Sequence, residues 1–141
     1  MNWKLILLLS MFGLAMALGT VFFIPPGAEP LLWPVIFITC AIVIARKAPG
    51  KFFLHGFLVG LTNWVWVSAA HVLFFHAYAA GHAKEVAAMQ ALAVPNIPII
   101  RQVVMAMRRY SLPIPGASGI VIGALSWAAS FAVRAVERWR D

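Results

Sequence analysis

The chain has 141 residues, of which 63% are hydrophobic and 11% are charged, and its mean hydropathy is +0.91. This balance excludes a water-soluble globular domain and makes lipid the expected surroundings of most of the chain. The net charge of +7 does not indicate a nucleic-acid partner, because the basic residues stand beside the ends of apolar stretches. We therefore expect membrane lipid as a partner and no nucleic acid.

Four apolar stretches follow one another along the chain, and we expect each to be a membrane-spanning helix. At a rise of about 1.5 Å per residue, a hydrocarbon layer of about 30 Å needs roughly 20 apolar residues. The predicted spans are residues 3–24, 30–45, 52–76 and 116–133. All four acidic residues lie outside them. The predicted fold is an all-α integral membrane protein, a single domain over 1–141 built as a four-helix transmembrane bundle.

The first span also has features of a cleaved signal peptide, namely Lys4 before the apolar run and Ala15-Met16-Ala17 inside it. However, the apolar run continues to Ile24 and stops only at Pro25. We therefore expect an uncleaved transmembrane helix. In the second span the single cysteine, Cys40, is expected to be a small buried hydrophobe.

The third span contains the polar side chains that are the best candidates for chemistry, because an amide or imidazole inside lipid is costly without a partner. Asn63 lies near the middle of this span and is expected to point into the bundle. One interpretation is a hydrogen bond between helices that only holds the bundle together. The other is a ligand site or polar path for a small solute, formed by Thr62, Asn63 and His71. The candidate hydrogen-bond partners of Asn63 are Ser10, Thr20 and Ser126.

Histidines follow the third span at spacings that raise the question of a metal or haem. If the helix continues through the alanine-rich segment after it, four side chains share one face. They are His71, Tyr78, His82 and Glu85. His82 and Glu85 could then bind a divalent metal together with His76, and facing imidazoles could hold a haem. Because the chain has no dense ligand motif, we predict no cofactor and keep haem or a divalent metal as an alternative.

A loop of about residues 78–114 connects the third and fourth spans and is expected on the extracytoplasmic side. Within it, apolar and basic residues separate onto opposite sides of a helix that starts after Asn96 as its N-cap. This predicts an amphipathic helix lying in the membrane interface between spans 3 and 4. The alternative is that residues 86–107 cross the membrane, which Pro95, Pro98 and Arg101 disfavour. The apolar side is Ile99, Ile100, Val103, Val104 and Met107.

Small residues recur at steps of three or four along three spans, and such residues let helices approach closely in lipid. We expect them to pack helices within the bundle, or alternatively to face a second subunit. The packing positions are Gly13 and Ala17 in the first span, Gly56 and Gly60 in the third, and Gly119, Gly123 and Ser126 in the fourth, where Gly116 and Ser130 extend the row.

Basic residues are distributed unequally between the two sides that four crossings would create. The richer side carries Lys4, Arg46, Lys47, Lys51, Arg134, Arg138 and Arg140. The other side carries Lys84, Arg101, Arg108 and Arg109. The positive-inside rule then places both termini in the cytoplasm, and the compact loops suggest a bacterial inner membrane.

No recognised catalytic constellation is present, since the spans contain no carboxylate and the chain has no phosphate-binding loop, nucleophile elbow, CxxC or HExxH. This favours a non-catalytic membrane protein over an enzyme. The expected function is that of an accessory or oligomer-forming protein, whose partner is a second copy or another membrane protein. Two alternatives remain: a transporter or channel for a small solute at Asn63 and His71, and a haem- or metal-binding membrane protein.

Overall fold

A computed structural model describes residues 1–25, 27–91, 95–109 and 113–139, apart from the side chains at 85, 89, 106, 107, 137 and 138. All regular structure in these ranges is helical, so the described part of the chain is all-α, as predicted. The helices are α1 (Trp3–Phe22), α2 (Glu29–Lys47), α3 (Phe52–Leu73), α4 (Phe75–Gly81), α5 (Ala83–Ala91), α6 (Ile99–Arg109) and α7 (Pro113–Arg138).

Four of these helices, α1, α2, α3 and α7, are long and apolar enough to cross a membrane. α1 has 20 residues and α2 has 19. At about 1.5 Å per residue, each is about 30 Å long, which matches the hydrocarbon layer of a bilayer. The predicted number of long apolar helices is therefore confirmed for the described residues.

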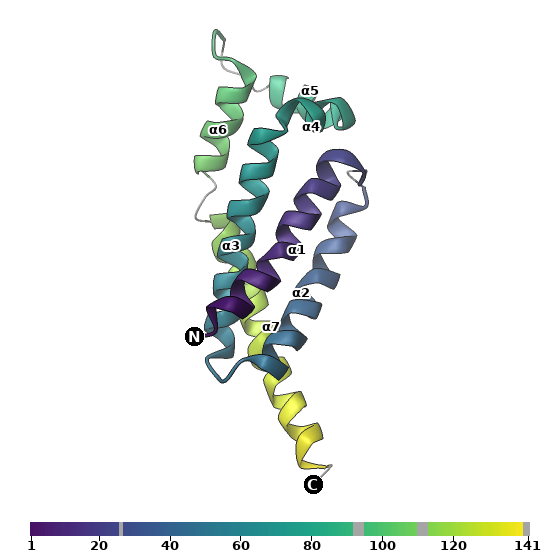
Figure 1. Cartoon of the computed structure of the whole chain (residues 1–141). Coiled ribbons are helices and arrows are strands. Elements are labelled where there is room, and N and C mark those ends of the chain that lie inside the picture. The colour runs from purple at the N-terminus through teal and green to yellow at the C-terminus, as the bar shows by residue number, and fades with distance from the viewer. Residues whose placement is uncertain (26, 92–94, 110–112, 140–141) are drawn as a thin grey trace.

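The long helices lie side by side and alternate in direction (Figure 1). α3 packs against α1 and α7, and α2 packs against α7. The N-terminus and the α2–α3 connection lie at one end, and the last part of α7 extends beyond it (Figure 1). We call the end with the N-terminus and the α2–α3 connection the terminal end. The opposite end, with the α1–α2 connection and with α4 and α5, is the loop end.

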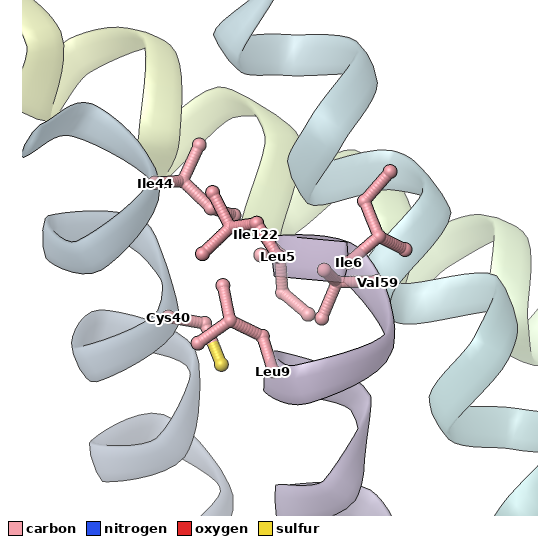
Figure 2. Close-up of a cluster of buried hydrophobic side chains, with 7 residues drawn as sticks. All are labelled: Leu5, Ile6, Leu9, Cys40, Ile44, Val59 and Ile122. Carbon is pink, nitrogen blue, oxygen red and sulfur yellow. The ribbon is translucent and has the colours of Figure 1, made fainter. Parts of the chain in front are cut away.

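All four long helices contribute to one buried apolar cluster (Figure 2). Its side chains are Leu5, Ile6 and Leu9 of α1, Cys40 and Ile44 of α2, Val59 of α3 and Ile122 of α7. Cys40 is a free thiol with no exposed surface. It therefore serves as a small apolar side chain of this core.

α3 and α7 approach each other through glycines. A Cβ atom added at Gly56 would lie 2.7 Å from the backbone nitrogen of Gly123, and one added at Gly60 would overlap with the backbone of Gly119. Only glycine permits such an approach. These predicted packing positions therefore face each other within one chain. One turn further along α7, the fully buried Ser126 donates to the carbonyl of Ile122 at 2.7 Å.

α1 and α3 are joined by close packing and by one hydrogen bond. Gly13 and Ala17 are buried on α1, and a Cβ added at Gly13 would lie 2.6 Å from Oδ1 of Asn63. Trp66 donates its indole N–H to the hydroxyl of Ser10 at 3.1 Å.

The first glycine of the predicted row on α7 makes no such contact. An added Cβ at Gly116 meets nothing within 4 Å. The contacts made by the predicted row of small residues on α7 therefore do not include its first turn.

Several helix ends differ from the predicted spans. α1 stops at Phe22 instead of Ile24, because the chain must leave helical geometry before Pro25. α3 stops at Leu73, since Phe74 adopts φ −109° and ψ 29° and the chain restarts as α4. The predicted span therefore ends three residues before residue 76, and the condition of a continuous helix through the alanine-rich segment is not met. α7 begins at Pro113, where proline is tolerated in a first turn.

The helix expected between the third and fourth spans is present as α6, but its start differs from the prediction. Asn96 is not its N-cap, because this residue adopts a left-handed turn (φ 66°) and α6 begins only at Ile99. α6 runs along the loop-end half of α3 (Figure 1), and its Val103 is buried. Its position in a membrane interface stays a prediction.

α7 begins part-way along α3. Gly119 lies opposite Gly60 and Gly123 opposite Gly56, so the two helices run antiparallel and the first turn of α7 is level with the middle of α3. α6 and α7 therefore cover successive parts of α3 (Figure 1). The place where α6 ends and α7 begins borders the site described next.

Candidate functional site

Two neighbouring cavities lie between α2, α3, α4, α6 and α7. Their volumes are about 390 Å³ and about 230 Å³. Glu29, Trp64 and Val67 line both of them. Because they share these walls, the cavities form two parts of one recess, which we call the aromatic groove.

α2 supplies one wall of the aromatic groove through three side chains spaced four residues apart. Glu29, Trp33 and Phe37 therefore lie on one face of the helix. The indole N–H of Trp33 donates to Oε1 of Glu29 at 3.2 Å. The ring centroids of Trp33 and Phe37 are 5.8 Å apart, with an angle of 51° between the ring planes. From the loop end inward, α2 thus presents a carboxylate and then two aromatic rings.

Glu29 was predicted to lie in a loop before the second span, and this is wrong. It is the first residue of α2, where a carboxylate is favoured by the helix dipole, and it borders the aromatic groove. The repeat of Glu29, Trp33 and Phe37 at steps of four was the available signal in the sequence. We missed it because the span was taken to start at Pro30.

α3 and α7 supply the opposite wall. Gly60 lies on this wall, where its missing side chain admits the backbone of Gly119, and Trp64 is the large aromatic residue on this side. From the first turns of α7, Ile114 and Ser118 close the groove, and Ser118 donates its hydroxyl to the carbonyl of Pro115 at 3.1 Å. The second cavity is completed by His71, Phe75, Tyr78 and Val103. The groove is therefore mainly apolar and aromatic.

Asn63 borders the groove. Its amide does not form the predicted hydrogen bond to a hydroxyl group of another helix. The residue is 4% exposed, and neither its Oδ1 nor its Nδ2 has a hydrogen-bond partner. The oxygen lies against Gly13 of α1. The three predicted hydroxyl partners instead donate to carbonyls of their own helices. These are Ser10 to Leu7, Thr20 to Met16 and Ser126 to Ile122.

Of the predicted polar path of Thr62, Asn63 and His71, two residues line the groove and Thr62 does not. The hydroxyl of Thr62 donates to the carbonyl of Leu58 at 2.8 Å, and Thr62 is not among the described residues that line the groove. His71 lines the second cavity, and its Nδ1 donates to the carbonyl of Val67 at 2.8 Å. Asn63 and His71 thus border one groove whose walls are aromatic.

The rings of His71, Tyr78 and His82 lie in succession although the helix is broken between them. The ring centroids of His71 and Tyr78 are 4.8 Å apart, and those of Tyr78 and His82 are 4.1 Å apart. The Nδ1 atom of His82 donates to the carbonyl of Tyr78 at 3.1 Å, and its buried Nε2 has no partner. Tyr78 therefore separates the two imidazoles.

The predicted metal ligands are not gathered into one site in the part of the chain that the structure describes. His76 is exposed and contacts the ring of Phe75. The side chain of Glu85 lies outside the described residues. Among the described side chains, no group of three His, Cys, Asp or Glu is placed to hold a metal ion.

His55 has a structural role that the sequence did not reveal. It is 1% exposed, and its Nε2 accepts the backbone N–H of Asn2 at 3.0 Å. Its Nδ1 therefore carries the proton and donates to the carbonyl of Lys51 at 3.0 Å. Asn2 in turn caps α1 by accepting the N–H of Leu5 at 3.1 Å. His55 thus ties the start of α1 to the start of α3.

We compared the chain with protein-family models, with curated proteins and with solved structures, and none of them matches it.

Proposed function

We propose that the chain is an integral membrane protein, a four-helix transmembrane bundle that binds a small apolar or amphipathic molecule in the aromatic groove. The observation that carries this proposal is the pair of cavities that share Glu29, Trp64 and Val67. The larger cavity, at about 390 Å³, falls in the size range of ligand pockets, about 300 to 1,000 Å³. Its mainly apolar walls suit a molecule that reaches it through lipid.

The proposed orientation follows the basic residues at the terminal end. Lys4, Arg46, Lys47 and Lys51 are all exposed there. This supports cytoplasmic N- and C-termini, and a bacterial inner membrane is the proposed location. The loop end, with Glu29 and the smaller cavity of the groove, then faces the opposite side of the membrane.

The groove does not favour a haem or metal function. The ring of Tyr78 lies between the imidazoles of His71 and His82 and keeps them apart, and His82 is not among the described residues that line the groove. A polar solute path is also less well supported than an apolar ligand site, because the Asn63 amide lies against Gly13. We therefore propose ligand binding without a catalytic step.

Val67→Phe is the variant that tests this proposal, because Val67 lines both cavities and a phenyl ring there would fill the groove. Protein in lipid nanodiscs is titrated with the neutral fluorescent probe 1-N-phenylnaphthylamine, and protein-free discs supply the background. We expect saturable binding to the unmodified protein and a loss of affinity of about tenfold or more in the variant.

Val65→Phe is the matched control, since Val65 is on the same helix but 60% exposed on its outer side. This variant should bind the probe as the unmodified protein does. Equal binding by Val67→Phe and by the unmodified protein would contradict the proposed function.

A second candidate function, assembly with another copy, is favoured by the position of α6. Arg109 is exposed in the last turn of α6, which runs along α3 toward the start of α7 (Figure 1). An exposed guanidinium group is costly against hydrocarbon. A second protein surface over α6 would remove that contact with lipid.

Cysteine substitution tests this second candidate. Val104 is 43% exposed on α6, and Val35 is 61% exposed on α2. We expect oxidation in native membranes to yield a covalent dimer of Val104→Cys and several-fold less of Val35→Cys. The readout is the dimer fraction on a non-reducing gel. Equal yields from the two variants would count against a dimer built through α6.

A further inference from the structure

We infer that the aromatic groove takes a lipophilic organic cation, with the positive charge beside Glu29 and the apolar body between Trp33, Trp64 and Phe37. This inference rests on the proposed ligand-binding function and adds the charge and chemical class of the ligand.

The first observation is that the Glu29 carboxylate has no cationic partner. It borders both cavities, and its Oε1 accepts the indole N–H of Trp33. In the described ranges, no lysine, arginine or histidine forms an ion pair with it. A carboxylate at the end of a membrane span is costly without a positive partner. A bound cation would supply one.

The second observation is the kind of side chain that surrounds this carboxylate. Trp33 and Phe37 of α2 form one wall, and Trp64 of α3 forms the other. Tyr78 adds a further ring in the second cavity. Aromatic faces attract cations through the ring quadrupole, and tryptophan does so most strongly. Carboxylate and rings together form the type of site that binds quaternary ammonium and phosphonium groups.

The third observation is the shortage of groups that would hold an anion. Neither cavity has a lysine or arginine among its described lining residues. The start of α7 is also a poor anion site, because Pro113 and Pro115 have no N–H to donate. The hydroxyl of Ser118 is already donated to the Pro115 carbonyl. A phospholipid would bring its phosphate with its headgroup, so we assign the groove to a free cation.

The order of the side chains along α2 also sets the orientation of the ligand. Glu29 lies at the loop end of the helix, and Phe37 lies two turns further in, beside Gly60. A ligand with one charged end and an apolar body fits with its charge toward the membrane surface and its body toward the bilayer middle.

The test uses two probes of the same shape and opposite charge, tetraphenylphosphonium and tetraphenylborate. Each is titrated into the protein in phosphatidylglycerol nanodiscs by equilibrium dialysis, with protein-free discs as the background. We expect saturable binding of tetraphenylphosphonium that Val67→Phe abolishes, and no such binding of tetraphenylborate. Glu29→Gln should weaken the cation by about tenfold or more, because the amide still accepts from Trp33 but carries no charge.

Glu137→Gln is the matched control, since it removes a negative charge from the last turns of α7, beyond the terminal end (Figure 1). It should leave tetraphenylphosphonium affinity unchanged within about twofold. If Glu29→Gln binds the cation like the unmodified protein, or if tetraphenylborate binds in the groove, the charge assignment is overturned while the groove remains a ligand site.

Two further outcomes separate the remaining explanations. The binding is also measured with the protein in phosphatidylcholine nanodiscs. If phosphatidylcholine competes with tetraphenylphosphonium for the groove and phosphatidylglycerol does not, the occupant is a lipid headgroup and the assignment to a free cation is wrong. If neither these probes nor 1-N-phenylnaphthylamine shows binding that Val67→Phe removes, the inference and the proposed function both fail.

Discussion

Gly56→Ala is expected to lower the free energy of unfolding by roughly 3 kcal/mol, the typical cost of forcing extra atoms into a packed contact. The added Cβ would lie 2.7 Å from three backbone atoms, the carbon and oxygen of Ile122 and the nitrogen of Gly123. Backbone atoms cannot rotate away as a side chain can, so α3 and α7 must move apart. Unfolding of the purified protein in mixed micelles, followed by circular dichroism, measures the effect.

Gly116→Ala is the control for this prediction. It adds the same methyl group to a glycine of the predicted row on α7, but the added Cβ meets nothing within 4 Å. Because alanine is favoured over glycine in a helix by about 1 kcal/mol, this variant should be as stable as the unmodified protein or more so. Equal destabilisation by both variants would show that the contact between α3 and α7 is not as close as described.

His55→Phe is expected to cost about 2 kcal/mol, because it leaves the N–H of Asn2 without its buried partner and removes the imidazole hydrogen bond to the Lys51 carbonyl, which keeps only the backbone N–H of residue 55. The phenyl ring keeps the approximate volume of the imidazole, so the loss reports the two hydrogen bonds. A second readout is hydrogen exchange at the start of α1, which should become faster because Asn2 also caps that helix.

His76→Phe makes the same exchange at an exposed histidine of α4. It should change stability by less than about 0.5 kcal/mol and leave exchange in α1 unaltered. Unchanged exchange at the start of α1 in His55→Phe would contradict the role assigned to His55.

The number of long apolar helices was predictable because helix length and composition are local properties. Their ends were less predictable. Phe74 is as apolar as its neighbours, yet the helix breaks there and the chain turns into α4. Hydropathy alone does not report such a break. Conversely, Pro113 and Pro115 suggested a later start for the last helix, although both are accommodated in the first turn of α7.

The candidate site was predicted only in part, for a similar reason. Asn63 and His71 were noted because polar side chains within apolar stretches are conspicuous in a sequence, and both border the groove. The aromatic residues Trp33 and Trp64 were not noted, because an isolated tryptophan in a membrane span is ordinary. Their importance comes from lining the same cavity, one from α2 and the other from α3.

The helical class, the apolar spans and the rows of small residues could be read from the sequence, because they depend on residues close together in the chain. The packing of the helices was needed to establish that α3 meets α7 through glycine backbones, that His55 holds Asn2, and that Glu29 enters a ring-lined groove. These features join residues far apart in the chain. They depend on which helices pack against each other and on how far each helix is shifted along its neighbour. The spacing of residues within a single helix does not specify either.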